Sequence, residues 1–266
     1  MDQPRLPSLV AIAVGNTRAR VGRFERGDLI EARSLGDLTA QDARDDLKHA
    51  LGEDPALVAI GSVAPTRSDH LAKLAQEFAP GAEIVRVGKD LPIPILHALD
   101  DASTVGHDRL LAALGAYRTA QQACVVIDVG TAVTVDFVDG EGTFQGGAIA
   151  PGLQMMLNAL NGQTEQLPPL DYERPSDARG PFGKDTPHAM QLGVTSMVRG
   201  LVRDRLESYA EAYGAFPQVI ATGGDAGILE QTELIDHFVP DLQLMGILAA
   251  VEGALEDAGD DEDTGG

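Results

Sequence analysis

The sequence predicts an α/β protein built from two similar domains, and three observations lead to that prediction. Short apolar stretches of strand length alternate along the chain with longer stretches of helical periodicity, which is the pattern of mixed α/β folds. The length of 266 residues suits one large domain or two of ordinary size. A stretch that starts at Val10 is matched by one that starts at Val125, at an offset of 115 residues and without a gap.

The repeat preserves the order of strands and turns. The first copy reads V-A-I-A-V-G-N-T-R-A-R-V-G-R-F-E-R-G-D-L and the second reads V-V-I-D-V-G-T-A-V-T-V-D-F-V-D-G-E-G-T-F. Gly15 aligns with Gly130, and the turn glycine Gly27 aligns with Gly142. Two buried hairpins can look alike without a common origin, but glycines at a fixed spacing and alternation in phase favour a duplication. Each domain is therefore expected to open with a three-stranded meander.

The two glycine turns predict a phosphate site. If the two domains face each other across a cleft, a glycine turn from each lies on its walls, and backbone N–H groups can hold phosphate oxygens from both sides. The slot before the first turn holds Ala13, whereas the matching slot in the second copy holds Asp128. Asp128 stands in an otherwise apolar run, where an unpaired carboxylate is costly, and this favours a bound cation or a hydrogen-bonded role.

The elements of the first domain follow from periodicity and turn signals. The expected strands are the apolar or alternating runs 8–14, 17–24, 29–34, 57–63 and 83–87. The expected helices are 40–51, 69–78 and the Leu/Ala-rich stretch 104–121. Ser103 or Thr104 could cap the last of these helices.

The second domain repeats the opening meander and ends in two helices. Its expected strands are 123–129, 132–138, 143–149 and 218–221, and its expected helices are 188–212 and 244–255. The segment from Gln163 to Pro187 is rich in Pro, Gly and charge, which predicts a long ordered loop or flap. The resulting domains are 1–118 and 119–255, followed by an acidic tail, 256–266, that is expected to be disordered.

Composition narrows the possible partners and the compartment. The net charge of −21 disfavours nucleic acid backbones and anionic membranes, although a small anionic ligand needs only a local positive site. The single cysteine, Cys124, lies in an apolar run and is expected to be a small buried hydrophobe in a reducing compartment. The sequence has no signal-peptide pattern and no apolar run of the ~20 residues that a membrane span needs, which predicts a cytoplasmic protein.

Six ordered motifs resemble those of the type III pantothenate kinases, which belong to the sugar kinase, heat-shock chaperone and actin superfamily. The resemblance covers about residues 9–255, and any one motif alone would be weak. The motifs are G-N-T at 15–17, V-G-H-D-R at 105–109, D-V-G-T at 128–131, G-G-A-I-A-P-G-L at 146–153, G-K-D-T at 183–186 and A-T-G-G at 221–224. The fold implied is α/β, with two duplicated ribonuclease H-like domains in the actin-like ATPase arrangement.

The resemblance also implies a reaction and its partners. ATP would phosphorylate the primary hydroxyl of pantothenate to 4'-phosphopantothenate, the first step of coenzyme A biosynthesis. A monovalent cation, potassium or ammonium, and a divalent metal, magnesium, would assist. The protein would be a cytoplasmic homodimer with pantothenate near the subunit interface, and neither nucleic acid nor membrane would be a partner.

The resemblance assigns roles to individual residues. Asp108 matches the proton acceptor, although from spacing alone it could be an acid stabilised in the first turn of a helix. Asp128 would bind the monovalent cation. The residues implied for substrate binding are Gly106, His107, Arg109 and Thr186, the last from the neighbouring subunit. The residues implied for ATP binding are Val14, Gly15, Asn16, Thr17, Arg20, Thr131, Gly223 and Gly224.

Two departures from the family pattern leave alternatives open. The first phosphate motif of the family reads D-x-G-N-T-x-x-K, and this chain has Ala13 for its Asp and Arg20 for its Lys. Leu99 stands where the family has a substrate-contacting aromatic residue. The main interpretation is an active kinase. The alternatives are a catalytically weakened kinase-like binding or regulatory protein, and an enzyme with the same scaffold and a different small acceptor.

Overall fold

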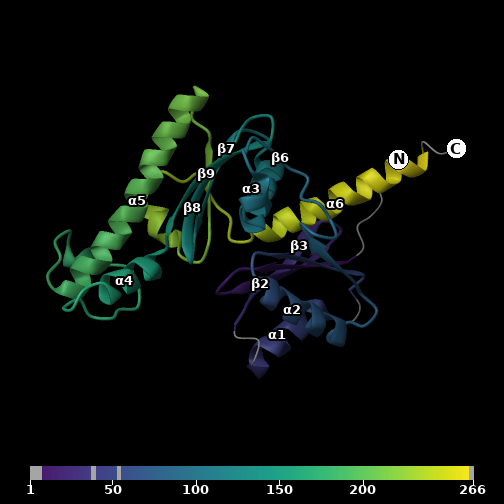
Figure 1. The fold of residues 1–266 in the computed structure, drawn as a ribbon, viewed down its shortest axis with the longest axis horizontal. Helices are drawn as coiled ribbons and strands as arrows, with labels where there is room; N and C mark the ends of the chain where they lie inside the picture. The colour runs from purple at the N-terminus through teal and green to yellow at the C-terminus, as the bar shows by residue number, and fades with distance from the viewer. Residues whose placement is uncertain (1–7, 37–39, 53–54, 264–266) are drawn as a thin grey trace. The chain divides into compact units, whose positions relative to one another are not determined.

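The computed structural model describes residues 8–36, 40–52 and 55–263, with side chains up to Asp257. The chain forms two compact units, coloured in Figure 1 by position along the chain. The first unit combines Met1–Thr119 with Asp241–Gly266, and the second is Ala120–Pro240. In the part of the chain that the structure describes, no helix is both long enough and apolar enough to cross a membrane.

The first unit is a five-stranded sheet with helices on both faces. The strand order is β3 (Asp28–Leu35), β2 (Ala19–Glu25), β1 (Leu9–Val14), β4 (Leu57–Ser62) and β5 (Glu83–Val87). The first three strands are antiparallel, and β4 and β5 run parallel to β1. The unit also contains the two-residue strand β6 (Leu96–His97) and the short 3-10 helix η1 (Ala102–Thr104).

Every residue of β1 is buried, because each face of the strand is covered by helices. Helices α1 (Gln41–Leu51) and α2 (Pro65–Phe78) pack with Val10, Ile12 and Val14. The alternate β1 residues, with Ala13 among them, pack with α3 (His107–Ala120) and α6 (Leu242–Asp263). The period-two side-chain alternation of a strand thus divides β1 between two apolar layers.

The second unit repeats the sheet order of the first. Five strands of its sheet follow the order β11 (His237–Phe238), β10 (Gln218–Thr222), β7 (Cys124–Val129), β8 (Ala132–Val138) and β9 (Thr143–Pro151), with the same parallel and antiparallel pairs as in the first unit. Its helices are α4 (Leu153–Gly162), η2 (Asp177–Arg179), α5 (Thr186–Tyr213) and η3 (Ala226–Thr232). The equal topology of the two sheets confirms the predicted duplication into two α/β domains.

Turn geometry supports the repeat at residue level. Gly27 and Gly142, which the alignment pairs, have φ angles of 88° and 84°. Both values lie in the left-handed region, which glycine adopts without the steric cost that a side chain would bring. Both meanders thus use a glycine in the left-handed region between the second and third strands, although residues 26–27 form the first connection and residues 139–142 the second.

Several predicted boundaries differ from the structure. Helix α3 begins at His107, and Ser103 and Thr104 belong instead to η1, where Asp101 accepts a hydrogen bond from the Ser103 N–H at 2.9 Å. Helix α4 was missed, because a proline and a glycine stand just before it and disguise the helical period. The predicted flap contains η2 and gives way to α5 at Thr186.

The C-terminal helix departs most from the prediction. Helix α6 belongs to the first unit, not to the domain predicted for residues 119–255, because its apolar face completes the layer around Leu9 and Ala11. It also continues to Asp263, through most of the acidic segment predicted to be disordered. An anchored helix extends at low cost, because nucleation is its expensive step. The last predicted tail residues, 264–266, lie outside the described residues.

Cys124 is fully buried, as predicted. Burial raises the pKa of its thiol to about 12, so the thiolate is disfavoured at neutral pH. Cys124 therefore serves as a small apolar residue of β7.

Candidate active site

Hydrogen bonds to backbone carbonyls hold the first glycine turn in place. The N–H of Gly15 donates to the carbonyl of Arg18 at 2.9 Å, which closes the turn after β1. The side chain of Arg67, on α2, donates from Nη1 to the carbonyls of Asn16 at 3.2 Å and Thr17 at 2.8 Å. Asn16 and Thr17 are themselves exposed, so the tip of the turn is both anchored and accessible.

Arg20 lies at the start of β2, beside this turn. It is half-buried, and its Nε donates to the carboxylate of Asp241, which directly precedes α6. Its Nη1 donates to Ser34 Oγ on β3 at 3.1 Å. The position predicted to carry a phosphate-binding cation therefore holds a guanidinium that the protein has already oriented.

The start of α3 adjoins the same edge of the first sheet. The backbone N–H of Val63, just after β4, donates to the Val14 carbonyl at 3.2 Å. A Cβ on Gly106 would lie 3.6 Å from Val63 Cγ1 and would overlap Asp108 Oδ1. Gly106 is therefore more than an ordinary residue before a helix, because its missing side chain leaves the space that the Asp108 carboxylate occupies.

Asp108 is half-buried in the first turn of α3. Its Oδ1 accepts a hydrogen bond from the backbone N–H of Arg109 at 2.9 Å. That N–H also donates to the Gly106 carbonyl at 3.1 Å, so the helix start and the carboxylate share one donor. One carboxylate oxygen is thus oriented by the backbone, which is a geometry suited to accepting a proton at the other.

His107, included among the substrate-binding candidates, has a packing role in the structure. A Cβ on Gly88 would lie 2.5 Å from the His107 ring, and Gly88 has a φ of 90°. The imidazole therefore rests on the backbone of the loop after β5. The substrate-binding role that the resemblance implies for His107 stays a prediction beside this packing contact.

The second glycine turn lies at the equivalent edge of the second sheet. The N–H of Gly130 donates to the Ala132 carbonyl at 2.9 Å, so this turn is also closed by a backbone hydrogen bond, but it is one residue shorter than the turn closed by Gly15 and Arg18. A Cβ on Gly223, whose φ is 95°, would overlap Asp128 Oδ1 and the Val129 carbonyl. Asp128 is therefore packed directly against the backbone at the end of β10. Thr131 and Gly224 are exposed beside it.

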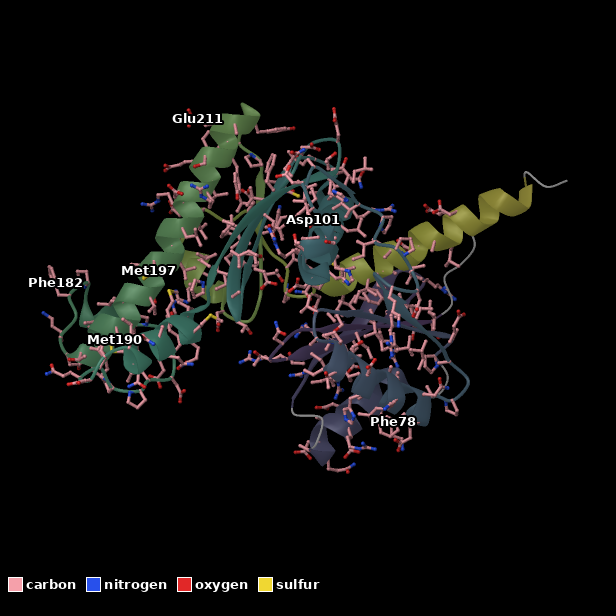
Figure 2. The ribbon with its side chains drawn as sticks, viewed as in Figure 1. Phe78, Asp101, Phe182, Met190, Met197 and Glu211 are labelled. Carbon is pink, nitrogen blue, oxygen red and sulfur yellow. The ribbon has the colours of Figure 1, made fainter. Side chains whose placement is uncertain are left out.

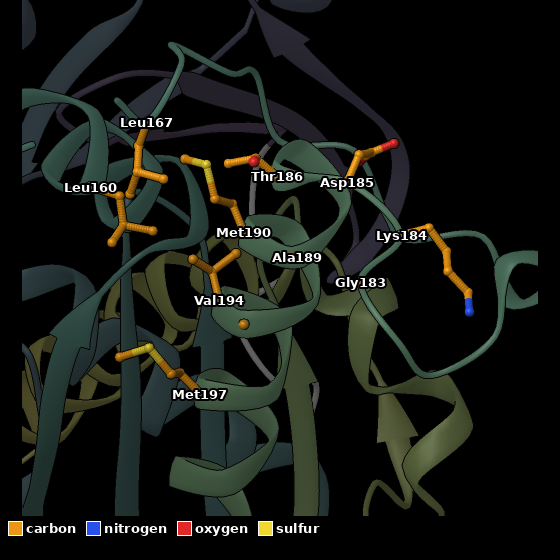
Figure 3. Close-up of a pocket in the computed structure, with 11 residues that line it drawn as sticks. Leu160, Leu167, Gly183, Lys184, Asp185, Thr186, Ala189, Met190, Val194 and Met197 are labelled. Atoms are coloured by element: carbon orange, nitrogen blue, oxygen red, sulfur yellow. The ribbon is translucent and has the colours of Figure 1, made fainter. Parts of the chain in front are cut away.

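Thr186 lies elsewhere in the second unit, at the beginning of α5. Asp185 caps this helix by accepting the His188 N–H at 2.8 Å, and its pKa is lowered by the hydrogen bond from Arg179 and then by that N–H. Thr186 is exposed and lines a cavity of about 650 Å³ between α4 and α5 (Figure 3). The cavity walls are mostly apolar and are formed by Leu160, Leu167, Gly183, Lys184, Asp185, Thr186, Ala189, Met190, Gly193, Val194 and Met197.

The structure thus groups the predicted site residues in three places. Val14, Gly15, Asn16, Thr17, Arg20 and residues 106–109 share one edge of the first sheet. Asp128, Thr131, Gly223 and Gly224 share the corresponding edge of the second. Thr186 belongs to the cavity between α4 and α5. Leu99, the residue in the family's aromatic slot, is half-buried in the segment between β6 and η1.

Three residues at these edges were missed by sequence reasoning. Arg67 and Asp241 bind the first turn and Arg20 from segments distant in the chain, and no local pattern announces such contacts. Gly152 was quoted only as part of a motif, yet a Cβ there would overlap the carbonyls of Gly130 and Thr131. The proline-glycine pair 151–152 after an apolar strand was the available signal for this close approach.

The acidic residues of the site suit a metal ion that takes only one or two ligands from the protein and its other ligands from phosphate and water. Among the described residues, no group of three or more His, Cys, Asp or Glu side chains could hold a metal ion. Magnesium at phosphoryl-transfer sites commonly takes only one or two carboxylates and completes its shell with phosphate oxygens and water. Asp128, half-buried beside a glycine turn, can supply such a ligand or face a monovalent cation.

Sequence comparison identifies the proteins that this chain resembles. The family model described as "Type III pantothenate kinase" matches residues 9–208. A type III pantothenate kinase from Dehalococcoides mccartyi is 30% identical over 249 residues, which is 90% of this chain and 95% of the relative. Another from Akkermansia muciniphila is 41% identical over 165 residues, which is 62% of this chain and 64% of the relative.

Two solved structures have similar folds. Component A of (R)-2-hydroxyglutaryl-CoA dehydratase from Acidaminococcus fermentans has a TM-score of 0.53 and 18% identity, covering 96% of this chain and all of that one. A glucokinase from an Antarctic psychrotroph has a TM-score of 0.50 and 13% identity, covering 94% of this chain and all of that one. At these identities the likeness shows the actin-like ATPase and sugar kinase fold alone.

Proposed function

The chain belongs to the type III pantothenate kinase family, and we propose that Asp108 is the base of its reaction. The reaction is the ATP-dependent phosphorylation of pantothenate to 4'-phosphopantothenate, the first step of coenzyme A biosynthesis. Relatives that carry this name align over nearly their whole length, which favours the enzyme over a weakened binding or regulatory protein.

The proposed chemical step is an in-line transfer. The primary hydroxyl oxygen of pantothenate forms a bond to the γ-phosphorus of ATP, the bond from that phosphorus to the β,γ-bridging oxygen breaks, and ADP leaves. The hydroxyl proton passes to the Asp108 carboxylate. The observation that supports this role is the position of Asp108, half-buried over Gly106 with one oxygen held by the Arg109 N–H. Positioning of the hydroxyl, more than basicity, is what such a carboxylate contributes.

Phosphate-binding groups are proposed on each unit by itself. In the first unit, the turn at 15–17 offers exposed polar side chains on an anchored backbone, and Arg20 offers an oriented cation. In the second unit, Thr131 offers an exposed hydroxyl, and Gly224, next to Gly223, offers exposed backbone without a side chain. The side chain of Arg109 suits the pantothenate carboxylate or a phosphate, because its planar fork matches either oxyanion.

Two cations are proposed to assist. A magnesium ion bound with ATP would neutralise charge on the phosphates, and a monovalent cation, potassium or ammonium, would bind at Asp128. The half-buried carboxylate of Asp128, beside the backbone of Gly223, supports this placement.

A homodimer is proposed on the apolar surface over α4 and α5. Met155 on α4 is 45% exposed, and Met197 on α5 and Phe182 just before it, both labelled in Figure 2, are 63% and 70% exposed. Exposed large apolar side chains that gather in one place are typical of a surface that another protein covers. A second copy of the chain would cover this surface and the adjoining cavity. Thr186, at the rim of that cavity, would then contact the pantothenate of the neighbouring subunit.

The proposed setting is the cytoplasm, with neither nucleic acid nor membrane as a partner. The net charge of −21 supports the exclusion of polyanions, because a surface of that sign repels them.

A coupled assay tests the function. Purified protein with ATP, magnesium, potassium and pantothenate should form ADP and a product that carries one new phosphomonoester, detected by ³¹P NMR. Omission of pantothenate should stop ADP formation. Bound nucleotide without phosphorylation of pantothenate would overturn the kinase assignment. Phosphorylation of another small alcohol in its place would favour the same scaffold with a different acceptor.

A further inference from the structure

The strand register places position 13 directly beside Arg20. In the antiparallel pair of β1 and β2, Ala13 stands opposite Arg20, and in the pair of β2 and β3, Arg20 stands opposite Ser34. Directly opposed residues share one face of a sheet and have neighbouring Cβ atoms. A carboxylate at position 13, the residue type of the family motif, would therefore lie next to the cation at position 20.

In this chain position 13 is part of an apolar layer. Ala13 is 6% exposed and packs in the same cluster as Leu244 and Ile247 of α6. The methyl group at position 13 supplies no partner for the guanidinium of Arg20. A half-buried guanidinium on that face needs a hydrogen-bonding partner, because desolvation of an unpaired charge is costly.

Asp241 supplies that partner from another part of the chain. Its carboxylate, 15% exposed, accepts a hydrogen bond from Arg20 Nε across a sequence separation of 221 residues. Its backbone carbonyl accepts the Met245 N–H at 3.1 Å, which places Asp241 at the start of α6. The helix is in turn anchored on β1 through Leu244 and Ile247.

We propose that Asp241, at the start of α6, is the positioning residue for Arg20. The inference rests on the proposed function, in which Arg20 binds an ATP phosphate. Nε is held by Asp241 and Nη1 by Ser34, so the guanidinium is fixed before nucleotide arrives. In this chain the acid that faces Arg20 lies at the start of α6, and the site has an oriented cation.

The first test removes the carboxylate and leaves the helix start intact. Asp241→Asn keeps the side-chain shape and is an equally good N-terminal cap residue. We expect the KM for ATP to rise roughly tenfold, as for the loss of a charge-assisted hydrogen bond, with a smaller change in kcat. The matched control is Asp69→Asn, which breaks the pair between Asp69 and Arg86 at 2.8 Å in the same unit and should leave both constants unchanged.

The second test moves the acid back. Ala13→Asp in the Asp241→Asn background should restore most of the lost ATP affinity, because the new carboxylate lies opposite Arg20. The same substitution in the otherwise unchanged protein should bring no gain, because Asp241 already fills the role. Equal KM values for the Asp241→Asn and Asp69→Asn variants, or no rescue by Ala13→Asp, would overturn the proposal.

Nucleotide binding separates this inference from the proposed function. Calorimetric titration with ATP and magnesium reports on Arg20 even if pantothenate is not the acceptor. If the unchanged protein shows no turnover, the proposed function is overturned. If ATP binding is nevertheless weaker in Asp241→Asn than in the unchanged protein, the role of Asp241 is sustained.

All variants are compared below their measured melting temperatures. If Asp241→Asn melts too low for assay, Asp241→Glu, which keeps the charge, must bind ATP more tightly than Asp241→Gln, and equal affinities would overturn the proposal.

Discussion

At the scale of the residue, missing side chains matter as much as those present. Gly106 leaves space for the carboxylate of Asp108, and Gly223 leaves space for the carboxylate of Asp128. In both places a Cβ would overlap the acid, so glycine and acid depend on each other. The two proposed functional carboxylates are thus positioned by backbone that only a glycine allows to come so close.

Replacement of Asp108 by Asn should remove proton abstraction and little else. General-base catalysis contributes typically 10²–10⁴-fold, so we expect kcat to fall by about that factor. The Kd of ATP should stay nearly unchanged, because the role assigned to Asp108 lies with the acceptor hydroxyl. The matched control is Asp101→Asn in η1, an exposed acid that caps Ser103. A kcat of Asp108→Asn equal to that of the control would show that the base lies elsewhere.

Gly223→Ala should be destabilising through both strain and crowding. The residue has a φ of 95°, and a Cβ would overlap the Val129 carbonyl and Asp128 Oδ1. We expect a loss of at least ~1–3 kcal/mol in the free energy of unfolding, together with weaker ATP binding. Gly200→Ala, in the middle of α5 where nothing lies within 4 Å of the new Cβ, should stabilise by about 0.5–1 kcal/mol. Denaturant melts of the two variants should therefore differ in sign.

At the scale of the element, α6 is the segment that completes the first unit. Its residues Leu244 and Ile247 close the apolar layer over β1. It crosses α3 in backbone-to-backbone contact, because a Cβ on Gly246 would overlap the Leu111 carbonyl and one on Gly115 would overlap the Leu242 carbonyl. Two glycines on facing helices thus permit the close crossing that seats Asp241 beside the first turn.

Helix α6 also carries a half-buried acid, Glu252, that predicts a pH effect. Burial raises the pKa of Glu252 above its ordinary 4.5, as does Glu256, whereas Arg118 opposes the shift. The folded state thus favours the protonated form, and this contribution to stability is present below pH 4.5 and lost as the pH rises through the folded pKa. Glu252→Gln should therefore raise the Tm at neutral pH, and the difference should vanish in acid. Glu211→Gln, at an exposed position of α5, is the control, and equal melting shifts for both variants would contradict the prediction.

At the scale of the whole molecule, the duplication supplies two equivalent sheet edges with different chemistry. The first edge has a cation, Arg20, paired with Asp241, and the second has the acid Asp128 beside Gly223. Each copy keeps a glycine at the start of the turn, but residues 15–18 connect the strands in the first copy and only residues 130–131 in the second, so divergence has affected the turn as well as the side chains around it. The repeated strand–turn–strand unit thus supplies a cationic side chain, Arg20, on one sheet edge and an acidic side chain, Asp128, on the other.

The proposed dimer is tested by a charge placed on the apolar surface. Met197→Lys, at a side chain that is 63% exposed on α5, should shift the protein from dimer to monomer in light scattering after gel filtration. Pantothenate binding should weaken as well, because Thr186 of the other subunit is lost. Phe216→Lys is the control, since Phe216 is 90% exposed and lies outside the residues that line the cavity. A Met197→Lys protein that remains dimeric would place the interface elsewhere.

The sequence by itself determined the repeated meander, its glycine turns, the burial of Cys124 and the family. These depend on local patterns: strand alternation, the left-handed turns at Gly27 and Gly142, and short ordered motifs. The roles of Asp108 and Asp128 were predicted from the motifs alone, and they stay predictions that the geometry supports.

Only the tertiary structure decided which distant groups meet. It joined Arg20 to Asp241 and Arg67 to the turn at Asn16 and Thr17, and it assigned α6 to the first unit. Such contacts depend on how separate elements pack, and no periodicity within either segment encodes them. Position 13 has no carboxylate in this chain, and Asp241 supplies one from the start of α6. A sheet edge can take a carboxylate from any element that packs beside it, so the motif around Ala13 does not by itself reveal this acid.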